Sequence, residues 1–371
     1  MNNVENANDK RIFGLDVIRA SAIFFVFFSH IHYLIGSNNE LLISLSGIFG
    51  YFGVELFFGL SGFLIGSILI NLYLEEKFNL TTIISFLKRR WLRTLPNYYL
   101  VLFLNIMIAL YFEFNLDNWF KYLLFFQNFY DYSITFFTES WSLSIEEFAY
   151  LFSPIILFTI HKFSNNKKWS FLTSILLLII TVHFFRYFNY LNSNIKDLFI
   201  WNESVKAVVV YRLDAILFGF LAAWFIKFYK NEIGKFKMLL LLIAILLFFV
   251  QFFQLSQILT IQNTSLYFNV FYFTLTSITI LCLLPFFILW KRTSNIIGKS
   301  ITWVSKISYS IYLLHYSVIS VLLKFFILNS KLIISDAVLI ASYTILTTFF
   351  SFLLYQFFEK PILNWRDKIR K

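Results

Sequence analysis

The chain has 371 residues, of which 59% are hydrophobic and only 14% are charged. Its mean hydropathy is +0.73, whereas a soluble domain carries about 25% charged residues. This composition excludes an ordinary water-soluble fold. The net charge of +11 does not indicate nucleic-acid binding, because the basic residues fall in short gaps between apolar runs and form no basic face.

Ten apolar segments are long enough to cross a membrane, since a helical span needs about 20 such residues. We therefore predict an all-α integral membrane protein with ten transmembrane helices. In chain order the predicted spans are 18–37, 47–74, 95–112, 142–161, 169–188, 207–227, 237–254, 268–290, 303–327 and 334–358.

The loops between these spans alternate in charge. Most of the 31 Lys and Arg residues lie in every second loop, and cytoplasmic loops are the ones enriched in Lys and Arg. Both termini are therefore expected in the cytoplasm, which requires an even number of spans. We expect one membrane domain over residues 1–371, with short tails at 1–17 and 359–371 and no soluble domain.

Two ionisable side chains lie in the first span, where each is costly unless it faces the protein interior or water. Arg19 and His30 are eleven positions apart, so at about 100° per residue they lie about 20° from the same helix face and about 16 Å apart. We expect both to point into one cavity, with Arg19 at the cytoplasmic boundary and His30 just past the bilayer centre. The alternative is an interfacial anchor and a histidine satisfied within the bundle.

Glu55 lies in the apolar segment GVELFFGLSGFLIG, whose glycines are most simply packing residues. An unpaired carboxylate in a span is protonated or needs a cation or histidine nearby. Glu55 is therefore a second candidate functional residue.

A basic cluster precedes the third span in the segment KRRWLRTLPNYY. Arg90 and Arg93 share one helix face because they are three positions apart. Arginine binds phosphate through paired planar donors, so the cluster could hold the phosphates of coenzyme A. Anchoring of the span at the cytoplasmic surface explains it equally well.

Three acidic residues enter the fourth span in TESWSLSIEEFAYLFSP. Glu146 or Glu147 could hold a histidine in the correct tautomer or bind sugar hydroxyls. Solvated acids at an outer helix end are the alternative for these two residues and for Glu139.

Further ionisable residues lie in the second half of the chain. YRLDAILFG places Arg212 and Asp214 in a span, where they could pair with other buried charges. In KISYSIYLLHYSV we interpret His315 as structural, and Glu359 closes the last span.

Taken in order, these motifs resemble the acyltransferase 3 family of polytopic membrane enzymes. LDVIRASAIFFVFFSH resembles its Arg-x10-His first helix, GVELFFGLSGFLI its second-helix signature, and RRWLRTLPNYY, WSLSIEEFAYLFSP and ISYSIYLLHYSV follow in family order. The resemblance implies transfer of an acyl group, usually acetyl from cytoplasmic acetyl-CoA, to a hydroxyl of a polysaccharide, lipid-linked glycan or peptidoglycan. It also implies the bacterial inner membrane and no metal. The family often has a histidine two positions before the Trp of WSL, where this chain has Glu139.

The mechanism expected from this resemblance uses His30 as the general base that removes a proton from the acceptor hydroxyl. Arginines would position acyl-CoA, and Glu55 or Glu146 would orient the base or the acceptor. A relay through a protein group is a second version, and a transporter, a flippase or a scaffold without acyl chemistry are the alternative functions. The residues carried over from the family are Arg19, His30, Glu55, Arg90, Arg93 and Glu146.

Overall fold

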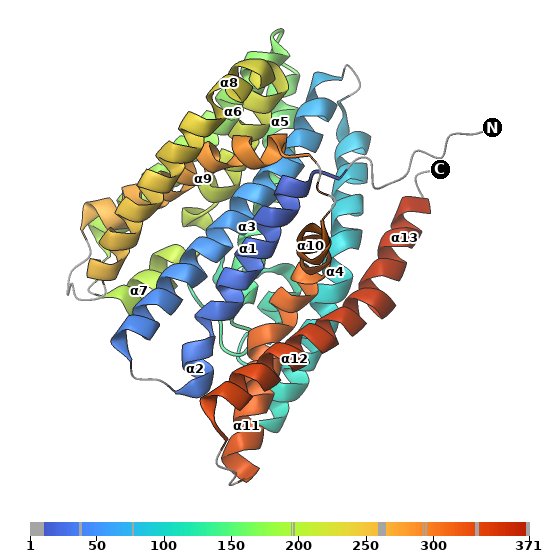
Figure 1. Ribbon diagram of the computed structural model, residues 1–371. Helices are drawn as coiled ribbons and strands as arrows, with labels where there is room; N and C mark the ends of the chain where they lie inside the picture. Colours follow the sequence, from blue (N-terminus) through green and yellow to red (C-terminus); the bar gives the residue numbers. More distant parts are fainter. Residues whose placement is uncertain are drawn as a thin grey trace.

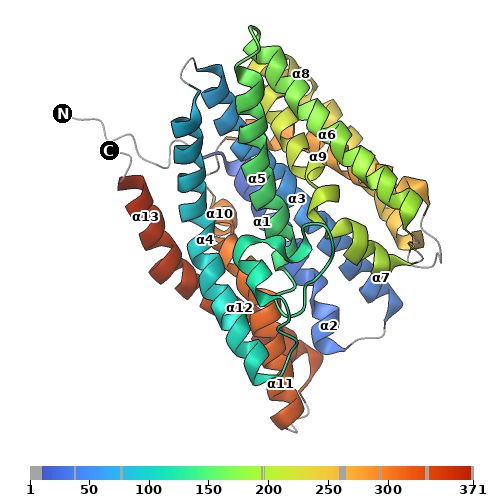
Figure 2. The same cartoon turned by 180° about the vertical axis from the view of Figure 1, so that it is seen from behind.

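The computed structural model describes residues 11–36, 39–75, 78–193, 195, 197–258, 265–291, 293, 295–330 and 334–368. Over these residues the chain is helical and contains no strand, which confirms the all-α prediction (Figures 1 and 2). The helices are α1 (Phe13–Ser29), α2 (Ile31–Ile35), α3 (Glu40–Leu74), α4 (Leu80–Tyr111), α5 (Ser140–His161), α6 (Lys167–Asn192), α7 (Leu198–Trp201), α8 (Asp214–Ile258), α9 (Tyr272–Leu289), α10 (Ile296–Leu314), α11 (Val321–Ser330), α12 (Asp336–Leu354) and α13 (Lys360–Lys368).

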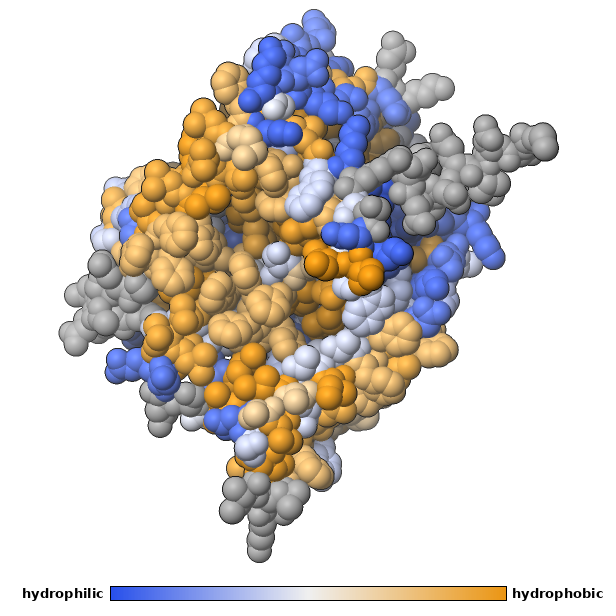
Figure 3. Space-filling view, in the orientation of Figure 1, coloured by the Kyte–Doolittle hydropathy of each residue, from blue (hydrophilic) through white to orange (hydrophobic). Residues whose placement is uncertain are grey.

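Nine helical segments in the described part of the chain are long and apolar enough to cross a membrane. Figure 3 shows apolar side chains covering the middle of one face, with hydrophilic residues toward its ends. Large apolar side chains such as Phe24 and Phe184 are each 62% exposed on this molecule, which suits helices whose outer faces meet lipid. The chain is a multi-pass membrane protein.

Two predicted spans, 207–227 and 237–254, fall largely within the single element α8. Its 45 residues would extend for about 67 Å, more than twice a hydrocarbon core. The helix is interrupted at Tyr229, where φ is −133° and ψ is 31°. Before this break α8 runs parallel to α3, because Ile216 packs on Gly62 and Lys227 donates a hydrogen bond to Asn71.

After the break α8 runs antiparallel to α9. Gly234 lies beside Leu289 at the end of α9, and Gln251 donates a hydrogen bond to Thr279 nearer its start. The chain therefore reverses within α8, which forms a hairpin of two spans. With this division the nine segments make ten crossings.

Several predicted boundaries are wrong. Residues 207–213 form short turns before α8, so Arg212 precedes the span that was expected to contain it. Helix α4 begins at Leu80 and not at residue 95, which places the arginine motif inside a helix. His30 lies at the junction between α1 and α2. Residues 1–10 and 369–371 of the predicted tails lie outside the described residues, and the cytoplasmic location of both ends stays a prediction.

Helix α3 lies at the centre of the bundle, where it packs against α1, α5, α8 and α9. Its contact with α8 is a close approach of two backbones. A Cβ atom on Gly62 would lie 2.1 Å from the carbonyl oxygen of Ile216, and one on Gly219 would lie 2.5 Å from that of Gly59. Small residues permit such packing between membrane helices, and here they fix a helix that lines both cavities described next.

Candidate functional site

Two adjoining cavities lie within the bundle. The larger, of about 400 Å³, is the arginine cavity, whose lining includes Arg19, Ser61, Arg90, Arg93, Glu146 and Tyr309. The smaller, of about 260 Å³, is the histidine cavity, whose lining includes His30, His32, Glu139, Lys206, His315 and Tyr316.

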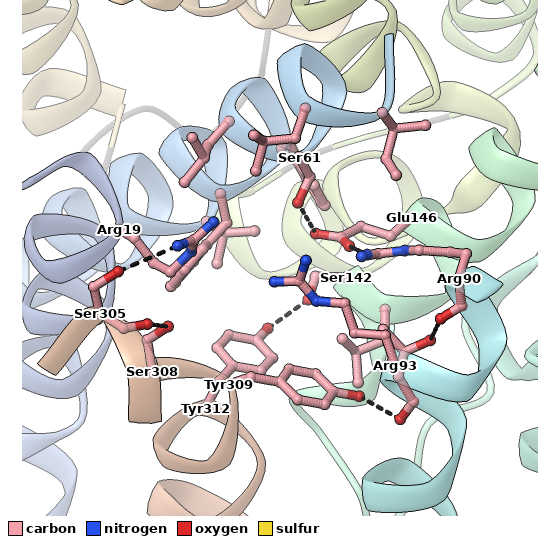
Figure 4. A pocket seen from close by; sticks show the side chains of 18 of the residues that line it. Arg19, Ser61, Arg90, Arg93, Ser142, Glu146, Ser305, Ser308, Tyr309 and Tyr312 are labelled. Carbon is pink, nitrogen blue, oxygen red and sulfur yellow. Dashed lines mark hydrogen bonds and ion pairs between the residues drawn. The ribbon is translucent and has the colours of Figure 1, made fainter. Parts of the chain in front are cut away.

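Three guanidinium groups line the arginine cavity, one from α1 and two from α4 (Figure 4). Arg19 donates to Ser305 Oγ at 3.2 Å and lies 3.8 Å from Asp16 Oδ1. Arg90 donates to Glu146 Oε2 at 3.1 Å. Arg93 forms no ion pair with any residue of the described ranges. The cavity thus carries more positive than negative charge and is suited to an anion.

Glu146 belongs to the arginine cavity and not to the histidine cavity. Its carboxylate accepts hydrogen bonds from Ser61 Oγ at 3.1 Å, Tyr150 Oη at 2.9 Å and Arg90. The guanidinium of Arg90 also lies 4.4 Å from the centroid of the Tyr150 ring. Glu146 therefore orients Arg90, and the geometry does not place it as the partner of a histidine.

The histidine cavity contains two neighbouring imidazoles. The ring centroids of His30 and His315 are 5.0 Å apart, and the Tyr316 ring lies 4.2 Å from that of His30 at an interplanar angle of 31°. His315 donates from Nδ1 to the carbonyl oxygen of Tyr312 at 2.8 Å, so its neutral form has an unprotonated Nε2. This atom is buried and has no hydrogen-bond partner among the described residues.

The sequence interpretation of His315 as structural missed this arrangement. The spacing of residues along one helix could not reveal that α10 crosses α1 beside His30. His315 also begins a π-helical turn, His315–Ser320, a feature often found at functional sites.

Two further charged groups line the histidine cavity from outside the spans. Glu139 Oε1 accepts from Ser317 N at 3.2 Å and Oγ at 2.7 Å, and burial raises the pKa of Glu139 to about 7. Lys206 donates to Asn202 Oδ1 at 2.9 Å, and burial together with Arg212 lowers the pKa of Lys206 to about 8. Both groups titrate near neutral pH.

Glu55 lines neither cavity. It is 1% exposed and forms an ion pair with Arg212. The arginine is the cation that this buried carboxylate was expected to need. A second buried pair joins Arg186 to Asp214 at 2.7 Å. The expected pairing of Arg212 and Asp214 with other buried charges is therefore confirmed, and the catalytic role expected for Glu55 stays a prediction.

The helix-face argument predicted that Arg19 and His30 share one cavity, but the two residues line different cavities. Val54 and Tyr312 stand between the two spaces and line both. The Tyr312 hydroxyl donates to the carbonyl oxygen of Glu139 at 3.1 Å and is hydrogen-bonded to Ser142 at 2.5 Å. The shared wall is thus held by α3, α5 and α10.

Comparison with known proteins shows the family of the chain. The family model of the acyltransferase 3 domain matches residues 12–356. The chain belongs to the acyltransferase 3 family. O-acetyltransferase OatA of Staphylococcus aureus is 27% identical over 94% of the chain, both in strain NCTC 8325 and in strain COL. The chain spans 57% of the length of OatA. No solved structure matches.

Membership of the acyltransferase 3 family confirms what the ordered motifs indicated. Within the described ranges, no three His, Cys, Asp or Glu side chains are grouped as metal ligands.

Proposed function

We propose that this protein is a membrane O-acyltransferase that moves an acyl group, most simply acetyl, from acyl-CoA to a carbohydrate hydroxyl. The observation that carries the proposal is the pair of adjoining cavities. One is lined by three arginines, the other by two histidines, and both are lined by Val54 and Tyr312.

The arginine cavity is the proposed donor site. Acyl-CoA carries phosphates at one end and a thioester at the other, and guanidinium groups bind phosphate through paired hydrogen bonds. Arg93 and Arg19 would contact the phosphates, while Arg90 is held in place by Glu146. The thioester would then lie at the wall formed by Val54 and Tyr312. This cavity would face the cytoplasm of a bacterial inner membrane.

The histidine cavity is the proposed site of acyl transfer. The acceptor oxygen attacks the thioester carbonyl carbon, so a C–O bond forms and the C–S bond breaks. His30 takes the hydroxyl proton as general base, and this proton is returned to the departing CoA thiolate. His315, with its unpartnered Nε2 beside His30, is a second proton acceptor at the same site.

The glycan acceptor would approach from the opposite face to acyl-CoA. Acetyl is favoured because the related OatA proteins are named O-acetyltransferases. Direct transfer needs no covalent acyl-enzyme, because the two cavities adjoin at Val54 and Tyr312.

The test is turnover of acetyl-CoA by the purified protein in detergent. We expect His30→Ala to lower kcat about 100-fold or more, since a general base contributes about that much. Arg93→Ala should instead raise the KM for acetyl-CoA about tenfold, as loss of a charged hydrogen bond does. Arg89→Ala is the matched control, because Arg89 lies on the same helix as Arg93 and lines neither cavity.

Two results would contradict the proposed function. The first is no release of CoA by folded wild-type protein, which would favour a transporter without acyl chemistry. The second is unchanged kcat in His30→Ala, which would remove His30 from the mechanism.

A further inference from the structure

A third hollow opens beside the histidine cavity. This tyrosine cleft has a volume of about 350 Å³, and its lining includes Tyr130, Asp131, Tyr132, Asn189, Glu203 and Tyr211. Tyr132 and Glu203 also line the histidine cavity. A molecule held in the tyrosine cleft can therefore extend one end toward His30.

Hydrogen bonds between two loops hold the cleft in shape. Val210 N donates to the carbonyl oxygen of Phe129 at 3.2 Å. Asn128 Nδ2 donates to the carbonyl oxygens of Ala207 at 2.5 Å and Trp141 at 2.9 Å. Because Phe129 and Val210 each adjoin a lining tyrosine, these contacts fix both sides of the cleft before any ligand binds.

The cleft carries the groups that recognise uncharged sugars. Tyrosine rings offer flat apolar faces to the C–H groups of a pyranose and a hydroxyl at the edge. The carboxylates of Asp131 and Glu203 accept hydrogen bonds from sugar hydroxyls, and the amide of Asn189 both donates and accepts. Among the described residues, the lining includes no Lys or Arg, so its two carboxylates would repel phosphate and sulfate groups.

We propose that the tyrosine cleft is the acceptor subsite, which binds uncharged sugar units of a glycan while a neighbouring hydroxyl reaches His30. This inference rests on the proposed acyltransferase function and adds the place and the chemical class of acceptor recognition. It assigns Tyr130, Tyr132 and Glu203 to glycan binding and gives them no part in proton transfer.

The experiment uses a deletion strain that lacks the gene for this protein. The full chain, wild type or variant, is expressed in this strain from a second copy of the gene. Ester-linked acetate is released from the envelope glycans by mild base and measured per unit of membrane protein. We expect Tyr130→Ala and Glu203→Gln each to lower glycan acetate at least about fivefold, from loss of one stacking or hydrogen-bonding contact. For the same purified variants, the KM for acetyl-CoA should stay within about twofold of wild type, because the donor contacts are untouched.

Tyr187→Ala is the matched control. Tyr187 is a half-exposed tyrosine of α6 that lies outside the cleft and both cavities, so glycan acetate should be retained. Wild-type levels of glycan acetate in Tyr130→Ala and Glu203→Gln would overturn the assignment. A rise in the KM for acetyl-CoA as large as the fall in glycan acetate would overturn it too. Failure of the proposed function is distinct, because wild-type cells would then contain no more glycan acetate than the deletion strain.

Discussion

Val54 and Tyr312 both line the arginine cavity and the histidine cavity. In the proposed reaction, the acyl group of a bound thioester would therefore lie against them. A side chain in such a place discriminates between substrates that differ by single methylene groups, an effect of about 10-fold or more per group.

We therefore predict that Val54→Ala enlarges the range of acyl donors. The ratio of kcat/KM for butyryl-CoA to that for acetyl-CoA should rise about tenfold, because removal of two methyl groups opens the wall. Val338→Ala, on an exposed face of α12, is the control and should leave the ratio as it is. An unchanged ratio in Val54→Ala would show that the acyl group does not lie at this wall.

Glu139 makes stability depend on pH. Burial raises the pKa of Glu139 to about 7 from its ordinary value of 4.5, so the folded state disfavours the ionised carboxylate. The resulting destabilisation is absent below pH 4.5, grows between pH 4.5 and 7, and is complete above pH 7, where it amounts to roughly 3 kcal/mol.

Glu139→Gln removes this ionisation while its carbonyl oxygen can still accept from Ser317. We predict a higher midpoint of thermal unfolding than wild type at pH 8 and little difference at pH 5, measured on protein in detergent micelles. Glu113→Gln, at an exposed carboxylate, should show the same difference at both pH values. A pH-independent effect of Glu139→Gln would contradict the raised pKa.

At the scale of residues, the sequence identified most of the charged groups but not their partners. Arg19, Arg90 and Arg93 were expected to bind an anionic donor, and they line one cavity. The pairings of Glu55 with Arg212 and of Glu146 with Arg90 join residues that are 157 and 56 positions apart in the chain. No periodicity within one helix determines such contacts.

At the scale of elements, the contact between α3 and the first half of α8 supports both cavities. Gly62→Ala would place a Cβ atom 2.1 Å from a backbone oxygen, and backbone cannot move aside as a flexible side chain does. We predict a loss of about 1–3 kcal/mol in stability, seen as a lower midpoint of thermal unfolding.

Gly234→Ala is the control for this packing prediction. Its added Cβ atom would lie 3.7 Å from the nearest neighbour, a side-chain carbon of Leu289, so the midpoint should stay close to that of wild type. Equal midpoints of thermal unfolding for Gly62→Ala and Gly234→Ala would mean that α3 and α8 can move apart without loss of stability.

Apolar length predicted the helices well, since lipid requires long apolar segments. It failed where helices exceed the membrane. Helix α4 has 32 residues and includes the arginine motif, whose Arg90 and Arg93 line the arginine cavity. A loop with basic residues was expected between the predicted spans 207–227 and 237–254. Within α8, however, the helical backbone is interrupted only at Tyr229.

At the scale of the whole molecule, three hollows follow one another through the bundle. Val54 and Tyr312 join the arginine and histidine cavities, and Tyr132 and Glu203 join the histidine cavity to the tyrosine cleft. This order could not be predicted from the sequence, because each hollow is formed by helices distant in the chain. In the proposed function, acyl-CoA and the glycan reach the histidines along this row of hollows from opposite faces of the membrane.

The most direct test of this claim compares sealed membrane vesicles of opposite orientation, each supplied externally with labelled acetyl-CoA, which does not cross the bilayer. We predict that inside-out vesicles, which expose the cytoplasmic face, transfer label to their glycans. Right-side-out vesicles and inside-out vesicles carrying His30→Ala should give only background label. Equal labelling of glycans in right-side-out vesicles, with or without His30, would contradict transfer through the two cavities.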